Sequence, residues 1–408
     1  MTAVAAVLLP LASITLPARA DTATLDSACA FGEATARVRA CTQMLDGTKD
    51  QAMKVLLHYR RGLAHTLTGD NEKAIEDFDA ALTIAPADLV TLTAKAEAQL
   101  RLGRVNEGLA AYARAVALDT RSARSLVNRG FALVNLERYD AAFDDFARAV
   151  EMEPRNAEAI KGRGDARRGR NECLAAISDY SAAIGLDRGY RNALYGRARC
   201  YMNMDDFVRA MTDLDRIVDI DPTYESAYFS RAYSRWRLGD ANQALTDYDK
   251  AIALAPDFSA ALAERGELRF SLKQYEPAMA DFDEALRLAP EDIETRLKRA
   301  ALWREVGDPN KAVTDATTAI EADPKRLRGY VERAEALLMA DRANDAIKDA
   351  NAALDLEPGS AFLLELRGRC FEAAGQRDKA IADFKEALRV DPSIKTARLG
   401  LARLDAKP

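Results

Sequence analysis

The sequence predicts an all-α solenoid, because its regularities share one period and none of them suits a β-sheet. A proline returns every 34 residues, small residues recur on the same lattice, and no alternating apolar–polar run of useful length appears. A strict period of this length is typical of stacked helix pairs, which form an extended surface rather than one globular core. The lattice prolines are Pro86, Pro154, Pro222, Pro256, Pro290, Pro324, Pro358 and Pro392, and Thr120 and Arg188 fill the two other slots.

Placing the proline at position 32 frames ten repeats that run from Val55 to Ile394. Position 8 is Gly or Ala in every repeat, position 20 is Ala except for Gly108, and position 27 is Ala except for Ile217. Columns of small residues let two helices approach closely, since larger side chains would push their axes apart. Position 24 is mostly aromatic, with Phe78, Tyr112, Phe146, Tyr180, Tyr248, Phe282 and Phe384.

Each repeat is expected to hold two amphipathic helices, called A and B. Positions 4, 8 and 11 form one helical stripe, and positions 20, 24 and 27 form another. Between the stripes, a glycine can end helix A in a left-handed conformation and the following aspartate can cap helix B. Such pairs are Gly69-Asp70, Gly239-Asp240 and Gly307-Asp308.

These columns resemble the tetratricopeptide repeat, and the resemblance covers residues 55–394. It implies a right-handed α-solenoid whose A helices line a concave groove that binds peptides or helices of partner proteins. Some chaperone-binding members hold a partner's C-terminal carboxylate in this groove. Arg124 and Asn128 occupy suitable positions for that role, but the set is incomplete and its specificity is not carried over.

The N-terminal 20 residues are set apart as a signal peptide. Ala3 to Leu16 is apolar, and Ala18-Arg19-Ala20 has the pattern of a signal peptidase site, which predicts cleavage after Ala20. An uncleaved anchor and a cytosolic tail are the alternatives. We therefore expect a periplasmic or secreted bacterial protein without membrane insertion after cleavage. The net charge of −6 gives no electrostatic footprint for nucleic acid.

Residues 21–54 are too degenerate for a full repeat and are expected to cap the first one. In an exported chain, Cys29 and Cys41 favour a disulfide that stabilises this end, with two separate buried thiols as the alternative. Cys200 and Cys370 fall at position 10 and are interpreted as small buried hydrophobes. A bridge between Cys173 and Cys200 is possible but nothing in the sequence supports it. Residues 395–408 are expected to form a capping helix at the other end.

A charge ladder runs beside the apolar columns. Position 7 is basic in every repeat, and position 23 is aspartate in all but the second, which has Lys95 and Ala111. We interpret the two columns as a structural ladder of arginine–aspartate pairs, within a repeat or across a repeat junction. A basic stripe that binds anions is the alternative. The ladder in repeats six and seven comprises Arg231, Asp247, Arg265 and Asp281.

The helix A residues opposite the core are the candidate partner-binding positions. At 100° per residue these are positions 2, 6, 9 and 13, flanked by 5 and 12. In repeats five to seven they hold aromatic and arginine side chains, which often dominate interfaces. The alternative is that the rings pack between neighbouring A helices. The candidate groove residues are Tyr195, Arg199, Phe229, Tyr233, Trp236, Arg237 and Phe270.

Repeat four combines basic residues with glycines in one helix A, which predicts either a cationic patch or hinge, or a weak but tolerated repeat. Its basic residues are Lys161, Arg163, Arg167, Arg168 and Arg170. His58 and His65 lack further ligands for a zinc site, and no phosphate-binding loop or nucleophile elbow is present. We expect no catalytic residues, metal or cofactor. The expected function is a non-enzymatic adaptor that binds a protein or peptide segment, with a self-associating architectural solenoid as the alternative.

Overall fold

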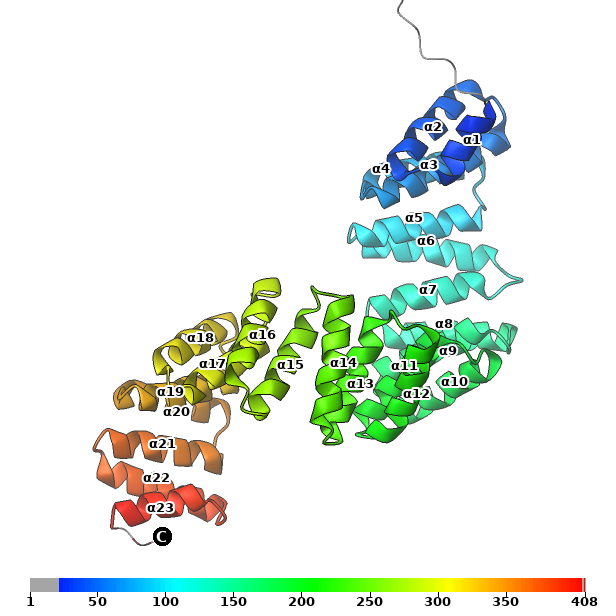
Figure 1. Cartoon of the computed structure of the whole chain (residues 1–408). Coiled ribbons are helices and arrows are strands. Elements are labelled where there is room, and N and C mark those ends of the chain that lie inside the picture. The colour runs from blue at the N-terminus through cyan, green and yellow to red at the C-terminus, as the bar shows by residue number, and fades with distance from the viewer. Residues whose placement is uncertain (1–21, 406, 408) are drawn as a thin grey trace, which may run out of the picture. The chain divides into compact units, whose positions relative to one another are not determined.

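The computed structural model describes residues 22–405 and residue 407, and all regular structure in this part of the chain is helical (Figure 1). The all-α solenoid prediction is confirmed. The predicted signal peptide, residues 1–20, lies outside the described residues. The chain forms two compact units, Met1–Cys200 and Tyr201–Pro408.

Helices A and B of the repeats occupy positions 1–13 and 17–30, with small variations at their ends. The A helices are α3 (Gln51–Leu67), α5 (Leu89–Arg101), α7 (Arg124–Asn135), α9 (Ala157–Gly169), α11 (Arg191–Asn203), α13 (Glu225–Arg237), α15 (Ser259–Ser271), α17 (Ile293–Glu305), α19 (Leu327–Met339) and α21 (Ala361–Ala373). The B helices are α4 (Asn71–Ile84), α6 (Val105–Leu118), α8 (Tyr139–Met152), α10 (Cys173–Leu186), α12 (Phe207–Ile220), α14 (Ala241–Leu254), α16 (Tyr275–Leu288), α18 (Pro309–Ala322), α20 (Ala343–Leu356) and α22 (Arg377–Val390).

Three further helices cover the two ends of the repeat array. In the N-terminal segment, α1 (Thr22–Phe31) and α2 (Ala34–Gly47) pack on each other and on α3. At the other end, α23 (Lys395–Arg403) packs on α21 and α22 and buries Leu401, whereas Leu399 stays 59% exposed. The terminal helix therefore covers the last repeat only in part.

The core depends on small residues that face aromatic rings. A Cβ atom added at Gly62 would lie 2.5 Å from the ring of Phe78, and one added at Gly130 would lie 2.7 Å from Phe146. Side chains cannot approach that closely, so glycine is required where these rings fill the space between helices. The close helix approach expected from the position 8 column is confirmed.

The predicted stripe on helix A was wrong at one position. Position 10, not position 11, is buried in every repeat, whereas position 11 includes half-buried arginines such as Arg269. The reason is that helix A packs on two neighbours, its own helix B and the helix B of the preceding repeat. Leu268 at position 10 thus joins Ala244 and Tyr248 of the preceding repeat in one cluster.

The helix connections follow the expected turn chemistry. Gly69, Gly239 and Gly307 have φ of 82°, 88° and 82°, in the left-handed region. The following aspartates cap the B helices; Asp70, for example, accepts a hydrogen bond from the backbone N–H of Lys73. The same turn is made without glycine in other repeats, at Glu137, Asn171, Asp205, Lys273 and Asp341.

Candidate functional site

Within each unit, the A helices form one continuous face. Consecutive A helices contact each other, from α3 to α9 in the first unit and from α13 to α21 in the second. Among the described helices of each unit, the B helices of consecutive repeats make no such contacts. The A helices therefore stand closer together, and each unit is concave on their side. We call this the inner face.

The candidate groove residues of repeats six and seven are half-buried, except for Arg237, which is exposed. Phe229 packs against Tyr248 and Phe258, with ring centroids 6.0 and 5.0 Å apart. Phe270 packs against Tyr275 at 6.2 Å. These rings pack against helix B or the turn that follows it rather than between neighbouring A helices, and they keep some exposed surface. Tyr195 and Arg199 belong to the first unit, and the other candidates belong to the second.

Tyr233 and Arg237 lie together with two further aromatic side chains. The rings of Tyr233 and Phe207 meet at a centroid distance of 6.1 Å, and Trp236 lies 6.4 Å from Tyr233. The Arg237 guanidinium lies 4.7 Å from the Phe207 ring and donates a 2.9 Å hydrogen bond to the Tyr233 hydroxyl. Its side chain is 44% exposed. The structure brings these groups together as one aromatic cluster.

A groove runs along the inner face of repeats one to three. Its lining includes Arg124 and Asn128, for which the sequence analysis considered a carboxylate-binding role without adopting it. It consists of two hollows of about 500 and 520 Å³ that share Glu97 and Asn128. We call it the inner groove. Apolar side chains from α3, α5 and α7 line much of it. The lining includes Tyr59, Leu63, Val90, Ala94, Glu97, Leu100, Arg101, Arg124, Asn128 and Phe131.

Glu97 lies where the two hollows meet. Its side chain is exposed to the groove, and among the described residues it has no ion pair within 4 Å. Desolvation by the surrounding helices raises the pKa of Glu97, and Arg101 one turn away opposes that shift. A carboxylate in such a place favours a positively charged partner.

The inner face of repeats eight to ten differs, because its charges pair with each other. Glu335 pairs with Arg369 and lies 3.9 Å from Arg304, and Arg304 also binds Glu332 at 2.9 Å. Arg369 binds Glu365 at 3.0 Å as well. Each of these charged groups thus has an opposite charge within 4 Å, whereas among the described residues Glu97 in the inner groove has none.

The ladder residues make bidentate ion pairs. The Nε and Nη2 groups of Arg265 donate to the two carboxylate oxygens of Asp281 at 3.0 and 2.6 Å. Nη1 of the same arginine donates to Asp249 of the preceding repeat at 2.6 Å. Arg269, at position 11, adds a 2.8 Å bond to Asp281. The Arg265 guanidinium thus links α14, α15 and α16. It pairs with an aspartate of its own repeat and with one of the preceding repeat at the same time.

The same arginine–aspartate pair recurs in repeats one, three, four and six to ten. The aspartate side chains are nearly buried, at 4% exposure for Asp281, whereas the arginines are partly exposed. In these eight repeats each arginine faces its own carboxylate, so their part of the column does not offer the free positive charge that anion binding needs. The other pairs are Arg61–Asp77, Arg129–Asp145, Arg163–Asp179, Arg231–Asp247, Arg299–Asp315, Arg333–Asp349 and Arg367–Asp383.

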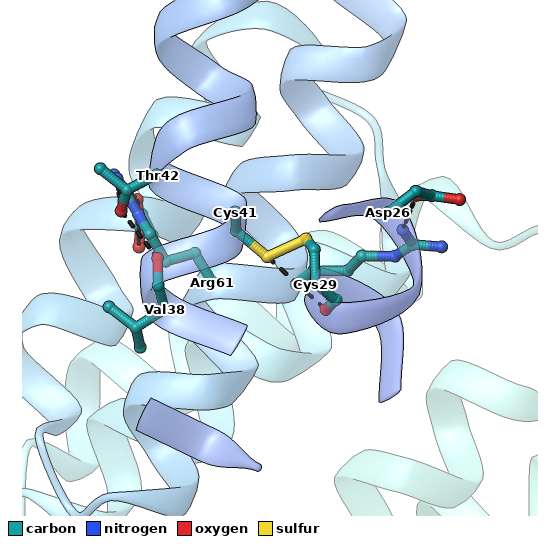
Figure 2. The surroundings of a disulfide bond; sticks show 8 residues. Asp26, Cys29, Val38, Cys41, Thr42 and Arg61 are labelled. Carbon is teal, nitrogen blue, oxygen red and sulfur yellow. Dashed lines mark hydrogen bonds and ion pairs between the residues drawn. A yellow bond between two sulfur atoms is a disulfide. The ribbon is translucent and has the colours of Figure 1, made fainter. Parts of the chain in front are cut away.

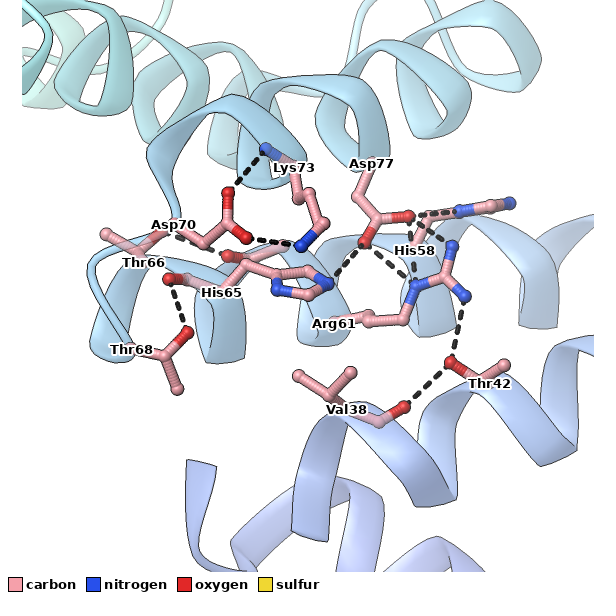
Figure 3. Close-up of polar contacts among 11 residues, drawn as sticks. Val38, Thr42, His58, Arg61, His65, Thr66, Thr68, Asp70, Lys73 and Asp77 are labelled. Atoms are coloured by element: carbon pink, nitrogen blue, oxygen red, sulfur yellow. Dashed lines mark hydrogen bonds and ion pairs between the residues drawn. The ribbon is translucent and has the colours of Figure 1, made fainter. Parts of the chain in front are cut away.

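His58 and His65 both lie beside Asp77 of the Arg61–Asp77 pair in repeat one (Figure 3). The Nδ1 atom of His58 lies 2.9 Å from Asp77 Oδ1, and Nε2 of His65 lies 4.0 Å from Oδ2. Arg61 also donates to the hydroxyl of Thr42 on α2 at 3.0 Å, so this pair ties the N-terminal cap to the repeats. The sequence analysis missed this arrangement, although the seven-residue spacing of the histidines placed both on one helix face.

A disulfide joins Cys29 on α1 to Cys41 on α2 (Figure 2). Both cysteines are fully buried beside Leu57 of α3. Cys200 and Cys370 are buried as well, and burial raises the pKa of the Cys370 thiol to about 12. Burial likewise raises the pKa of Cys200, whose thiol also has a hydrogen bond with Cys173.

The basic residues of repeat four are balanced by nearby acids. Lys161 binds Asp165 at 2.6 Å, and Arg163 and Arg167 both bind Asp179. The glycines of this helix face rings; a Cβ atom at Gly162 would lie 2.2 Å from Phe146. Of the alternatives for this repeat, a free cationic patch is not favoured, because most of these cations are paired, and the glycines serve close packing.

The chain belongs to the tetratricopeptide repeat family. Models of this repeat match residues 55–88, 93–159, 161–225, 229–293, 298–361 and 366–404. The resemblance inferred from the proline lattice is thus confirmed. A comparison with curated proteins gives no match.

Several solved structures are similar to this chain at low identity. A tetratricopeptide repeat protein from Parabacteroides merdae is 21% identical over 61% of this chain and 98% of its own, with a TM-score of 0.48. Yeast Tom70 is 17% identical over 94% and 95%, with a TM-score of 0.44. Pseudomonas aeruginosa pilF is 19% identical over 50% and 94%, with a TM-score of 0.44. None of these similarities bears on what this chain binds.

No described helix is long and apolar enough to span a bilayer. Within the same part of the chain, no group of three or more His, Cys, Asp or Glu side chains is arranged to hold a metal ion.

Proposed function

We propose that this protein is a non-enzymatic adaptor that binds a segment of another protein in the inner groove of repeats one to three. The observation that carries the proposal is the pair of joined hollows between α3, α5 and α7. Val90 lies on their wall with 49% of its surface exposed, although it is apolar. Apolar surface in a concave site is typical of ligand-binding grooves.

The lining of the groove indicates the chemistry of the bound segment. Tyr59, Leu63 and Phe131 can contact apolar side chains, and Glu97 between them can accept hydrogen bonds from a basic one. A partner segment in which a lysine or arginine is flanked by apolar residues would therefore fit this lining. The aromatic cluster around Tyr233, in the other unit, offers a separate contact surface, because tyrosine, tryptophan and arginine are enriched where interfaces gain most of their binding energy.

We also propose that the protein works in the cell envelope. The sequence of residues 1–20 supports export, and the Cys29–Cys41 disulfide suits an oxidising compartment. Cell fractionation followed by sequencing of the mature N-terminus tests this part. We expect Asp21 as the first residue of a periplasmic or secreted form, and an intact N-terminus in the cytosol would contradict it.

Site-specific crosslinking tests the binding function. A photo-reactive residue at position 90 in the inner groove and one at position 233 are compared with one at Lys250, which is exposed on helix B. We expect a protein to be trapped from position 90, with or without position 233, but not from position 250. Equal trapping at all three positions, or at none, would refute a partner bound on the inner face.

One observation favours the alternative of a self-associating solenoid. Phe31 of α1 is 88% exposed and Leu399 of α23 is 59% exposed, so each end of the repeat array presents an apolar side chain. If these ends associate, the sedimentation coefficient rises with concentration, and Phe31→Glu or Leu399→Glu abolishes the rise. A monomer at all concentrations would exclude this alternative.

A further inference from the structure

The second repeat departs from the charge ladder in both of its members, and a hollow lies at that place. Lys95 stands where the other repeats have arginine, and Ala111 stands where they have aspartate. The hollow, of about 630 Å³, lies between α4, α5 and α6. The polar side chains around it are Asp79, Thr83, Lys95, Gln99, Glu107 and Arg114.

An intact ladder pair leaves much less room at the equivalent place. In repeat nine, Arg333 binds both oxygens of Asp349 at 2.8 and 2.7 Å. The hollow beside this pair measures about 240 Å³. The difference follows from the side chains, because the methyl group of Ala111 does not reach the space that an aspartate carboxylate fills.

The cations at this hollow keep unused donors. Lys95 Nζ donates to Asp79 Oδ1 at 2.5 Å, which repeats the junction contact that ladder arginines make. An ammonium group has three donors, so Lys95 can serve a second acceptor. Arg114 donates to the backbone carbonyl of Pro86 at 2.6 Å through Nη2 alone. A negatively charged group between these two cations would take the place of the missing aspartate.

A buried acceptor lies at the same hollow. Gln99 is 5% exposed, and its Nε2 donates to Glu107 Oε2 at 3.2 Å. Its Oε1 atom has no hydrogen-bond partner among the described residues. A buried acceptor without a donor is costly, so a donor brought by a ligand would be favoured here. The carboxylate of Glu107, which already accepts a hydrogen bond from Gln99, would also favour a hydrogen-bond donor on the ligand.

We propose that this hollow binds a small carboxylate that also carries a hydrogen-bond donor, the class that includes α-hydroxy acids and α-amino acids. The ligand carboxylate accepts hydrogen bonds from Lys95 and Arg114, where an aspartate stands in the other repeats. The hydroxyl or ammonium group of the ligand donates to Gln99 Oε1. The site is separate from the inner groove, because the two have no lining residue in common.

Ligand-observed NMR tests the proposal with three probes on the full chain. Acetate supplies the carboxylate alone, glycolate adds a hydroxyl and glycine adds an ammonium group; sodium chloride keeps the ionic strength constant. We expect line broadening with glycolate or glycine that exceeds that with acetate, and whichever probe broadens more identifies the donor. Broadening by acetate as strong as by the other two would refute the role of Gln99.

Two variants locate the binding. Ala111→Asp supplies the carboxylate from the chain itself, so the protein should fold, melt at a higher temperature and lose the broadening. Lys95→Met should lose the broadening without a higher melting temperature. Ala141→Asp adds the same charge at an exposed position of α8 and should leave binding unchanged. Absence of broadening for all probes in the folded wild type, or unchanged broadening in Ala111→Asp, would overturn the proposal.

Discussion

At the scale of single residues, the ladder shows why a partly exposed ion pair can matter in this protein. Asp281 is nearly buried and accepts hydrogen bonds from both Arg265 and Arg269. Removing one partner would leave a buried carboxylate with fewer donors, and that costs more than the loss of a surface pair. The ladder therefore fixes how each helix A sits against its helix B.

A double-mutant cycle on Arg265 and Asp281 measures this coupling. We expect an interaction free energy of about 1.5–3 kcal/mol, because the pair is bidentate and its carboxylate is buried. The same cycle on Arg265 and Asp247 is the control, since Asp247 binds Arg231 and Arg235 instead. Unfolding in urea gives both values. Coupling to Asp281 no larger than coupling to Asp247 would contradict the structural ladder.

The disulfide acts on the end of the array. Cys29 and Cys41 are 12 residues apart, and closing a loop of this size stabilises the folded state by about 2–3 kcal/mol. In a repeat protein this effect stays near the crosslink, because each unit contacts only its neighbours. We expect Cys29→Ser with Cys41→Ser to speed amide hydrogen exchange in α1, α2 and α3. Cys370→Ser serves as the control, and faster exchange throughout the chain would argue against a local cap.

At the scale of helices and turns, the left-handed residue between helices A and B limits stability in several repeats. Glu137 has φ of 57°, in a region that residues with a Cβ atom enter at a cost of about 1–2 kcal/mol. Glycine adopts it freely but loses more entropy on folding, by roughly 0.5–1 kcal/mol. We predict that Glu137→Gly raises the free energy of unfolding by about 0.5–1 kcal/mol.

The opposite exchange provides the control for this turn. Gly239 has φ of 88°, and Gly239→Ala should lower stability by about 1 kcal/mol. Both variants are compared with the wild type by urea unfolding. If Glu137→Gly were destabilising, the side chain of Glu137 would have to contribute more than its backbone strain costs.

The helices and turns could be predicted from sequence, whereas several contacts of the site could not. The 34-residue period fixed the register, so the Gly-Asp turns and the arginine–aspartate columns followed directly. Periodicity does not show how far a long side chain reaches, which is why the link from Arg269 to Asp281 was missed. Periodicity also does not show which A helices keep their inner face accessible. The sequence analysis chose the repeats richest in aromatic residues, and Glu97 and Val90 lie outside them.

At the scale of the whole molecule, the repeats share one core design but differ on their inner face. In repeats eight to ten, side chains such as Arg304 and Glu332 satisfy each other. In repeats one to three, Glu97 stands in a groove without an ion pair. Repetition thus provides the structure, and departures from it provide candidate binding sites, both in the inner groove and at the missing ladder pair of repeat two.

The pH dependence of binding distinguishes a role of Glu97 from simple burial of apolar surface. Desolvation raises its pKa, so acidification neutralises Glu97 before ordinary carboxylates, while a lysine in the partner stays charged. The affinity for a synthetic peptide copied from the segment trapped at position 90 should therefore increase as the pH rises through the pKa of Glu97. Glu97→Gln should bind about fivefold more weakly at pH 7 and lose this dependence. The control is Glu267→Gln, at the same repeat position in the other unit, which should bind like the wild type. Equal affinity of the wild type, Glu97→Gln and Glu267→Gln would show that Glu97 takes no part in binding.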